Sequence, residues 1–246
     1  MQARHVPAID GRYWAGITLA SIFGTNLGDL YAHESGLGLL GGLPILVVLF
    51  AIVFVAERFD RLSHDAYYWL CIIIMRTGAT NIADYTASPG LEIGHLKLSI
   101  GLAVLLVALV AWAARGGAGA RTATTTKTLP TTDARYWLAM LTAGVLGTAL
   151  GDALQSILGQ TPAAAALGVL LAAALLMYRR GVLPILAAYW LTVTIARTAG
   201  TAIGDWLAEN GTLHLGLPIA TLFSGVTFAS VLLLWRRRQP RMETAS

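Results

Sequence analysis

One pattern occurs four times along the chain and restricts the fold more than any other feature. A Tyr-Trp pair is followed, twelve residues after the tyrosine, by a threonine and, sixteen residues after it, by an aspartate. Repetition at a constant spacing indicates that one supersecondary unit recurs along the chain. The four copies are Tyr13-Trp14 with Thr25 and Asp29, Tyr68-Trp69 with Thr80 and Asp84, Tyr136-Trp137 with Thr148 and Asp152, and Tyr189-Trp190 with Thr201 and Asp205.

Each copy lies in an apolar stretch that is long enough to span a bilayer as a helix. The chain is 56% hydrophobic and only 12% charged, with a mean hydropathy of +0.66, which is typical of a polytopic membrane protein and not of a soluble domain. We therefore predict an all-α fold with eight transmembrane helices. They are expected at residues 13–32, 37–56, 67–86, 96–114, 136–158, 163–178, 184–207 and 213–235.

The eight helices group into four tandem, parallel helical hairpins. In each hairpin a helix that carries the motif runs outward and a more apolar helix returns. Asp10, Asp65 and Asp133, each three residues before the tyrosine, are predicted helix N-caps, and Pro184 marks the start in the fourth copy. The helices that carry the motif are expected inside the bundle, because a helix that is polar on one side cannot face lipid there.

Basic residues predict the orientation of the hairpins. Arginines and lysines fall almost entirely on one side of the predicted membrane, which we take as cytoplasmic, with both termini on that side. The chain then divides into a first half at residues 1–114, a Gly/Ala/Thr-rich cytoplasmic linker at 115–132 and a second half at 133–246. The net charge of +4 reflects this topology and gives no reason to expect nucleic acid binding.

In these features the chain resembles a bacterial family of multi-pass membrane proteins that is described only as a repeat of unknown function. That family has four tandem repeats, each with two membrane spans and a characteristic tryptophan. The resemblance covers essentially the whole chain, and it implies the topology and a location in the bacterial inner (cytoplasmic) membrane. It implies no activity. The tryptophans at the corresponding positions are Trp14, Trp69, Trp137 and Trp190.

Small residues precede both the threonine and the aspartate of each motif. They form a small-xxx-small pattern, which lets helix backbones approach closely in a bilayer. The threonine and the aspartate follow these residues directly and lie beside the packing seam, about 100° around the helix. Four such helices would turn their polar groups toward a shared interior. The small pairs are Gly24 and Gly28, Ala79 and Ala83, Gly147 and Gly151, and Gly200 and Gly204.

Two arginines lie deeper in the membrane than the aspartates. Arg76 and Arg197 come eight residues after their tyrosines, whereas the first and third copies have Ser21 and Gly144 there. We expect the two arginines to be related by a pseudo-twofold axis between the halves. At ~1.5 Å per residue, each is about 12 Å from the aspartate of its own helix. Each arginine must therefore find polar groups of another helix, water or a bound anion.

The remaining candidate ligands are oxygen and imidazole groups. Asn26 and Asn81 follow the threonine in the first two copies, and with the aspartates and threonines they supply hard oxygen ligands that suit Mg²⁺, Mn²⁺ or Ca²⁺. Burial favours the protonated form of a carboxyl group, so the aspartates can also carry protons. His33, His95 and His214 lie near the outer helix ends, where they either recruit metal or sit in solvated loops.

Three hypotheses about function follow. The first is a secondary transporter or exporter of a small cation, expected to be divalent and coupled to protons, with no resident cofactor. The second is a transporter of a small anionic solute that Arg76 and Arg197 bind. The third is a membrane scaffold in which the motif only holds helices together. No enzyme motif was found, so we expect no enzyme. The expected partners are the lipid bilayer and a small ion or solute, and the sequence leaves open whether copies form a homo-oligomer.

Overall fold

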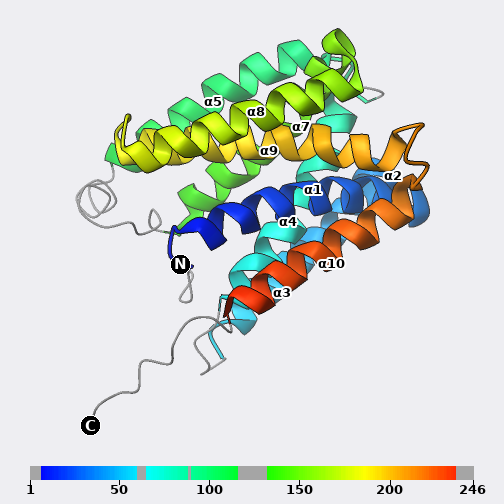
Figure 1. Cartoon of the computed structure of the whole chain (residues 1–246). Helices are drawn as coiled ribbons and strands as arrows, with labels where there is room; N and C mark the ends of the chain where they lie inside the picture. The colour runs from blue at the N-terminus through cyan, green and yellow to red at the C-terminus, as the bar shows by residue number, and fades with distance from the viewer. Residues whose placement is uncertain (1–6, 60–64, 88–89, 116–131, 237–246) are drawn as a thin grey trace.

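The computed structural model describes residues 7–59, 65–87, 90–115 and 132–236, and these residues form helices and no strand (Figure 1). This confirms the all-α prediction, and each of the eight expected segments coincides with helix over most of its length, although the segment 37–56 is divided at Gly42 and the segment 213–235 begins three residues before its helix. Residues 116–131, which make up most of the predicted linker, lie outside the described residues. The helices are α1 (Gly11–Glu34), α2 (Gly38–Gly41), α3 (Leu43–Ala56), α4 (Ala66–Ala87), α5 (His95–Arg115), α7 (Ala134–Leu158), α8 (Gln160–Arg180), α9 (Ile185–Glu209) and α10 (Gly216–Arg236).

The helices that carry the motif begin as the sequence indicates. The Asp10 carboxylate accepts a hydrogen bond from the Tyr13 amide at the start of α1, and Asp133 caps α7 in the same way. Pro184 directly precedes α9. The Asp65 carboxylate, before α4, instead accepts from the Trp69 indole N–H at 3.1 Å and from Arg12 of α1.

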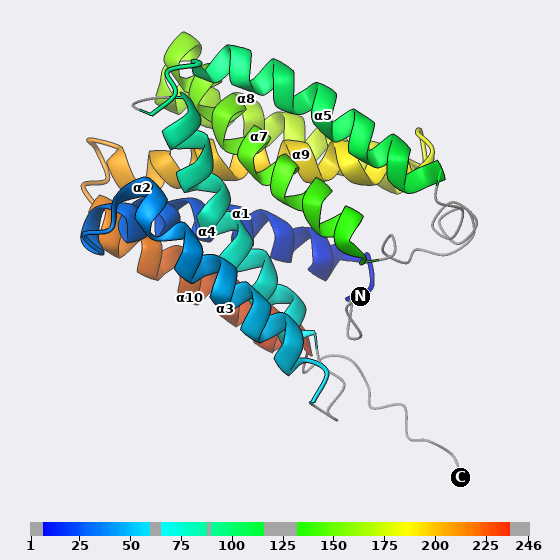
Figure 2. The same ribbon diagram turned by 180° about the vertical axis from the view of Figure 1, so that it is seen from behind.

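Four helices, α1, α4, α7 and α9, form an inner ring, and we call them the motif helices. Their neighbours follow the chain order, α1 against α4, α4 against α7 and α7 against α9, and α9 closes the ring against α1 (Figures 1 and 2). All four are largely buried. The prediction that they lie inside the bundle is therefore confirmed, and they surround one axis rather than two separate centres.

The other long helices, α3, α5, α8 and α10, form an outer layer. Each packs chiefly on the motif helix of the next repeat: α3 on α4, α5 on α7, α8 on α9 and α10 on α1. The last contact joins the end of the chain to its beginning (Figure 2). The outer helix of each repeat therefore covers the motif helix of the next repeat, and the four repeats form one bundle.

The small residues of the motif allow this ring to close. A Cβ on Gly24 would lie 2.4 Å from the Arg76 side chain, and one on Gly147 would lie 2.5 Å from the Cβ of Arg197. Between α4 and α7 the arrangement is reversed. The glycine, Gly144, lies on the later of the two helices and faces Ala79 of α4. At each of these contacts the side chain of a residue on one motif helix is therefore met by glycine on its neighbour.

The outer layer presents apolar side chains to the surroundings. Val47, Ile100, Val169 and Leu222 are examples of large hydrophobic residues that are more than half exposed. Among the described residues, five helices are long and apolar enough to cross a membrane. Such a surface is suited to lipid and would be costly in water. The five segments are Gly38–Ala56, His95–Arg115, Ala134–Leu158, Gln160–Arg180 and Gly216–Leu234.

Candidate functional site

The axis of the inner ring carries polar groups at three successive levels, and the first is a closed ring of tyrosine hydroxyls. Successive hydroxyls lie 2.5–3.1 Å apart, and the order of the contacts follows the order of the motif helices. The tyrosines are fully or almost fully buried. We call this set the tyrosine ring. Its members are Tyr13, Tyr68, Tyr136 and Tyr189.

The motif tryptophans surround the tyrosine ring. Each indole packs edge-on against the tyrosine before it in the sequence, with ring centroids 5.2–5.3 Å apart. It also contacts the tyrosine of a neighbouring motif helix, as Trp69 does with Tyr13 at 5.8 Å and Trp14 with Tyr189 at 5.9 Å. This aromatic packing fixes the tyrosine side chains, so the hydroxyls meet on the axis.

The second level is formed by the motif threonines around one guanidinium group. Arg76 is 1% exposed and donates five hydrogen bonds. One goes to the Gly144 carbonyl and four go to the threonine hydroxyls, which come from all four repeats. In the structure the threonine oxygens therefore bind the arginine. The distances from the guanidinium nitrogens are 2.6 Å to Thr25, 3.2 Å to Thr80, 2.7 Å to Thr148 and 2.6 Å to Thr201.

Arg197 occupies the equivalent position on α9 but its contacts lie at a different level. Its Nη1 donates to the Ser21 hydroxyl at 3.4 Å and its Nη2 to the Met140 sulfur at 3.3 Å. Met140 is only four residues after its tyrosine, whereas the threonines bound by Arg76 are twelve residues after theirs. The two arginines therefore point in opposite directions along the axis. The expected pseudo-twofold relation holds for their backbone positions and fails for their side chains, since two like charges cannot occupy the same point.

The third level contains the four motif aspartates, which are partly exposed. They lie near enough to one another to interact electrostatically, as Asp29 and Asp84 each do with Asp152. His95 lies 3.4 Å from the Asp152 carboxylate, and Gln155 donates to the Asp205 carboxylate at 2.6 Å. The structure thus brings together the predicted threonines and arginines on the axis, with the aspartates at the ends of the same helices.

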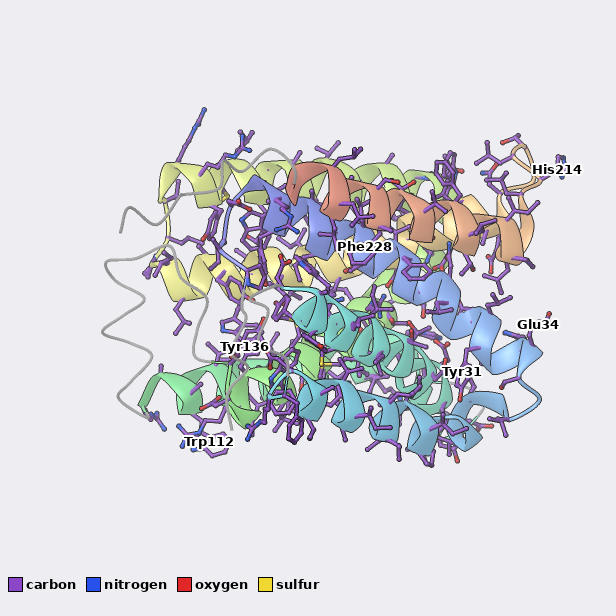
Figure 3. All side chains as sticks on the ribbon, turned by 90° about the horizontal axis from the view of Figure 1, so that it is seen from below. Tyr31, Glu34, Trp112, Tyr136, His214 and Phe228 are labelled. Atoms are coloured by element: carbon purple, nitrogen blue, oxygen red, sulfur yellow. The ribbon has the colours of Figure 1, made fainter. Side chains whose placement is uncertain are left out.

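Two predicted ligands and two histidines do not join these groups by direct contact. Asn26 and Asn81 are fully buried, and their side chains have no hydrogen-bond partner among the described residues. His33 contacts the backbone oxygen of Asp29 at 2.7 Å, and His214 lies in the loop before α10, at the same end as Glu34 (Figure 3). Within the part of the chain that the structure describes, no group of three or more His, Cys, Asp or Glu side chains could hold a metal ion. The predicted metal set is not supported.

Sequence reasoning missed two features of the site. It did not include the motif tyrosines among the candidate site residues, although their fourfold recurrence was a signal that they share an environment. It also gave no role to Gln155 and Gln160 of the third repeat. In the structure they bind the fourth repeat, because Gln160 donates to the Asp205 backbone oxygen at 3.3 Å and to the Glu209 carboxylate at 3.0 Å.

Comparison with known proteins agrees with the repeat architecture. Residues 12–61 and 188–240 match the family model described as Repeat of Unknown Function (DUF347). These segments are the first and the fourth of the hairpins, and each contains the motif tryptophan. No curated protein and no solved structure matches the chain. The resemblance inferred from the sequence is thereby confirmed: the chain carries this repeat, whose description assigns no activity.

Proposed function

We propose that the protein is a membrane transporter of a small ion and that the axis of the four motif helices is its pathway. In this proposal all eight long helices cross the bilayer, with both termini in the cytoplasm and the aspartates near the outer face. The apolar outer layer and the five helices of membrane-spanning composition support the membrane location. The positive-inside pattern of the sequence supports the orientation.

The observation that carries the proposal is the stack of polar groups on the axis. Every repeat contributes a tyrosine, a threonine and an aspartate, and two buried arginines lie between the first and third levels. Small-xxx-small seams alone would hold such a ring together. Charged groups inside a membrane helix bundle are costly, and where they occur they mark ion and substrate paths.

The two buried arginines on the axis favour an anion over a metal cation. Arg76 and Arg197 are both 1% exposed, and within the described residues neither has a carboxylate at ion-pair distance. The four threonine oxygens that could bind a cation are already bound to Arg76. A small anion would be stabilised by the arginines, and the aspartates would then couple its movement to protons.

One observation keeps the cation as a second candidate. The four aspartates interact electrostatically with one another. The carboxylates of Asp29 and Asp84 have no hydrogen-bond partner among the described residues, so their oxygens are free to bind an ion. A divalent cation such as Mn²⁺ or Mg²⁺ prefers such oxygens. In this case Arg76 would have to leave the threonines to let the ion pass.

Flux into proteoliposomes tests the proposal and separates the two candidates. The panel contains formate, chloride and phosphate, and Mn²⁺, Mg²⁺, Ca²⁺ and Zn²⁺. We expect anion flux in the wild type that falls about tenfold or more in Arg197→Gln, because a charge-assisted interaction is lost. Tyr178→Phe is the matched control, since its hydroxyl has no hydrogen-bond partner among the described residues and lies on α8 outside the ring.

The other outcomes are equally decisive. Flux of a metal ion that is lost in Asp84→Asn would show that the transported ion is a cation and not an anion. No flux of any ion in protein that retains its folded tryptophan fluorescence would overturn the proposal and favour the membrane scaffold.

A further inference from the structure

The two buried arginines differ in how completely their hydrogen bonds are satisfied. Arg76 donates five hydrogen bonds from its two terminal nitrogens, and it interacts electrostatically with Asp205, Asp29 and Asp152. Its positive charge is therefore shared among oxygen atoms of all four motif helices. Arg76 connects all four repeats, and its hydrogen bonds leave little capacity for a ligand.

Arg197 has no comparable set of partners. Its two contacts are a long hydrogen bond to the Ser21 hydroxyl and a contact to the Met140 sulfur, which is a weak acceptor. Its Nε, like that of Arg76, has no hydrogen-bond partner in the described part of the chain, so the difference between the two arginines lies in their terminal nitrogens. A buried charge without a partner is strongly unfavourable. The surroundings of Arg197 therefore lack an acceptor that carries negative charge.

The tyrosine ring lies next to this guanidinium group. The Met140 sulfur that Arg197 contacts belongs to α7 and follows the ring tyrosine Tyr136 by four residues, so the guanidinium group lies about one helical turn from the ring. The ring has four hydroxyl protons and four hydroxyl–hydroxyl contacts, so a closed ring uses every proton internally. A stronger acceptor at the centre would let these hydroxyls exchange a tyrosine partner for the acceptor, since hydrogen bonds to an ionised group are stronger than those between neutral groups.

We propose that Arg197 and the tyrosine ring together form a binding site for a small monovalent oxyanion with a planar head, of the carboxylate type. The guanidinium fork matches the two oxygens of such a head. One unpaired arginine balances one negative charge. The inference rests on the proposed transport function, because it names the class of substrate that would move along the same axis. In it the tyrosine ring is the gate that the bound anion opens.

The motif tryptophans provide a direct readout of this site. Because every ring tyrosine contacts its own tryptophan and that of a neighbouring repeat, a rearrangement of the hydroxyls should change the indole environment. The experiment is a tryptophan-fluorescence titration of the purified full chain in detergent micelles. Sodium formate is the probe, sodium gluconate is the bulky monovalent control and sodium sulfate is the divalent control, all at constant ionic strength.

We expect a saturable response to formate that gluconate and sulfate do not produce. Arg197→Gln should raise the apparent Kd for formate about ten- to a hundredfold, since it removes a charge-assisted contact. Arg197→Lys keeps the charge without the fork and should give an intermediate value. Tyr136→Phe removes one ring hydroxyl and should weaken binding, whereas Tyr178→Phe should leave the Kd unchanged.

Two results would overturn the inference. One is no formate response of the wild type up to about 100 mM, which would put any affinity below the useful range. The other is a formate response that survives both Arg197→Gln and Tyr136→Phe, which would place binding elsewhere. Should Arg197→Gln fail to fold, the comparison of Tyr136→Phe with Tyr178→Phe decides alone.

Binding and flux separate this inference from the proposed function. Formate binding at this site without flux in proteoliposomes would support the site and refute transport. Flux with binding that does not depend on Arg197 would support transport and refute the site.

Discussion

The contact between α9 and α1 gives the sharpest test of the ring. A methyl group added by Gly200→Ala would lie 2.3 Å from the Cβ of Ser21 and 3.0 Å from its carbonyl carbon. Carbon atoms in favourable contact are about 3.5–4.0 Å apart, so the two helices must move apart by roughly 1 Å. Overpacking of this kind costs about 1–3 kcal/mol, and we expect the free energy of unfolding to fall by that amount.

The assay is unfolding by SDS in mixed micelles, followed by tryptophan fluorescence. Gly168→Ala is the matched control, because it lies in the interior of α8 and its added Cβ would meet no atom within 4 Å. That change should stabilise the protein by about 0.5–1 kcal/mol, as alanine does in place of glycine within a helix. The two substitutions therefore change the free energy of unfolding in opposite directions, because only the methyl group of Gly200→Ala meets another helix.

A double variant tests the packing between α9 and α1 more strictly. Ser21→Gly combined with Gly200→Ala places the methyl on one helix and the glycine on the other, the arrangement that Ala79 and Gly144 already have between α4 and α7. It should recover part of the lost stability, but not all, because backbone contacts near 3.0 Å remain. Equal stabilities of Gly200→Ala and Gly168→Ala, or no recovery in the double variant, would refute the proposed packing of the ring.

Two further predictions concern charged side chains. Arg76→Met should lower the free energy of unfolding by about 2 kcal/mol or more, because five hydrogen bonds are lost. In anion-free buffer Arg197→Met should leave it unchanged or raise it by up to about 2 kcal/mol, because it removes a buried charge that has only two weak contacts and no carboxylate partner among the described residues; equal losses in both variants would contradict this difference. The Arg12–Asp65 pair, at 2.8 Å, joins α1 to α4, and a double-mutant cycle of Arg12→Gln and Asp65→Asn should give a coupling of about 1 kcal/mol; additive effects would show that the pair contributes nothing.

Much of the fold could be predicted from local patterns. Apolar stretches gave the positions of the helices, and the constant spacing of the motif gave the repeats. The polar residues of four helices indicated that these lie inside, because a lipid-facing helix cannot carry them. For the same reason the sequence indicated that Arg76 and Arg197 need partners outside their own helices. For Arg76 this is confirmed, since Thr25, Thr148 and Thr201 belong to other motif helices.

The candidate site was predicted less completely. The threonines and arginines were found, but the tyrosine ring was not, because a Tyr-Trp pair at the start of a membrane helix has an ordinary role at the interface. The metal-binding prediction assumed that carboxylate, hydroxyl and amide oxygens on separate helices converge on one ion. Sequence spacing fixes the height of a residue on its helix and says nothing about the distance between helices.

The sequence by itself determined which residues form helices, which helices face inward and at what height each polar group lies, because these properties depend on periodicity and rise along one helix. Only the tertiary structure decided that α10 packs on α1 and closes the ring. It also decided that Arg76 and Arg197, at equivalent positions, turn to opposite ends of the axis. Equivalent positions in a repeat specify equivalent backbones, but two like charges on one axis repel each other and must take different partners.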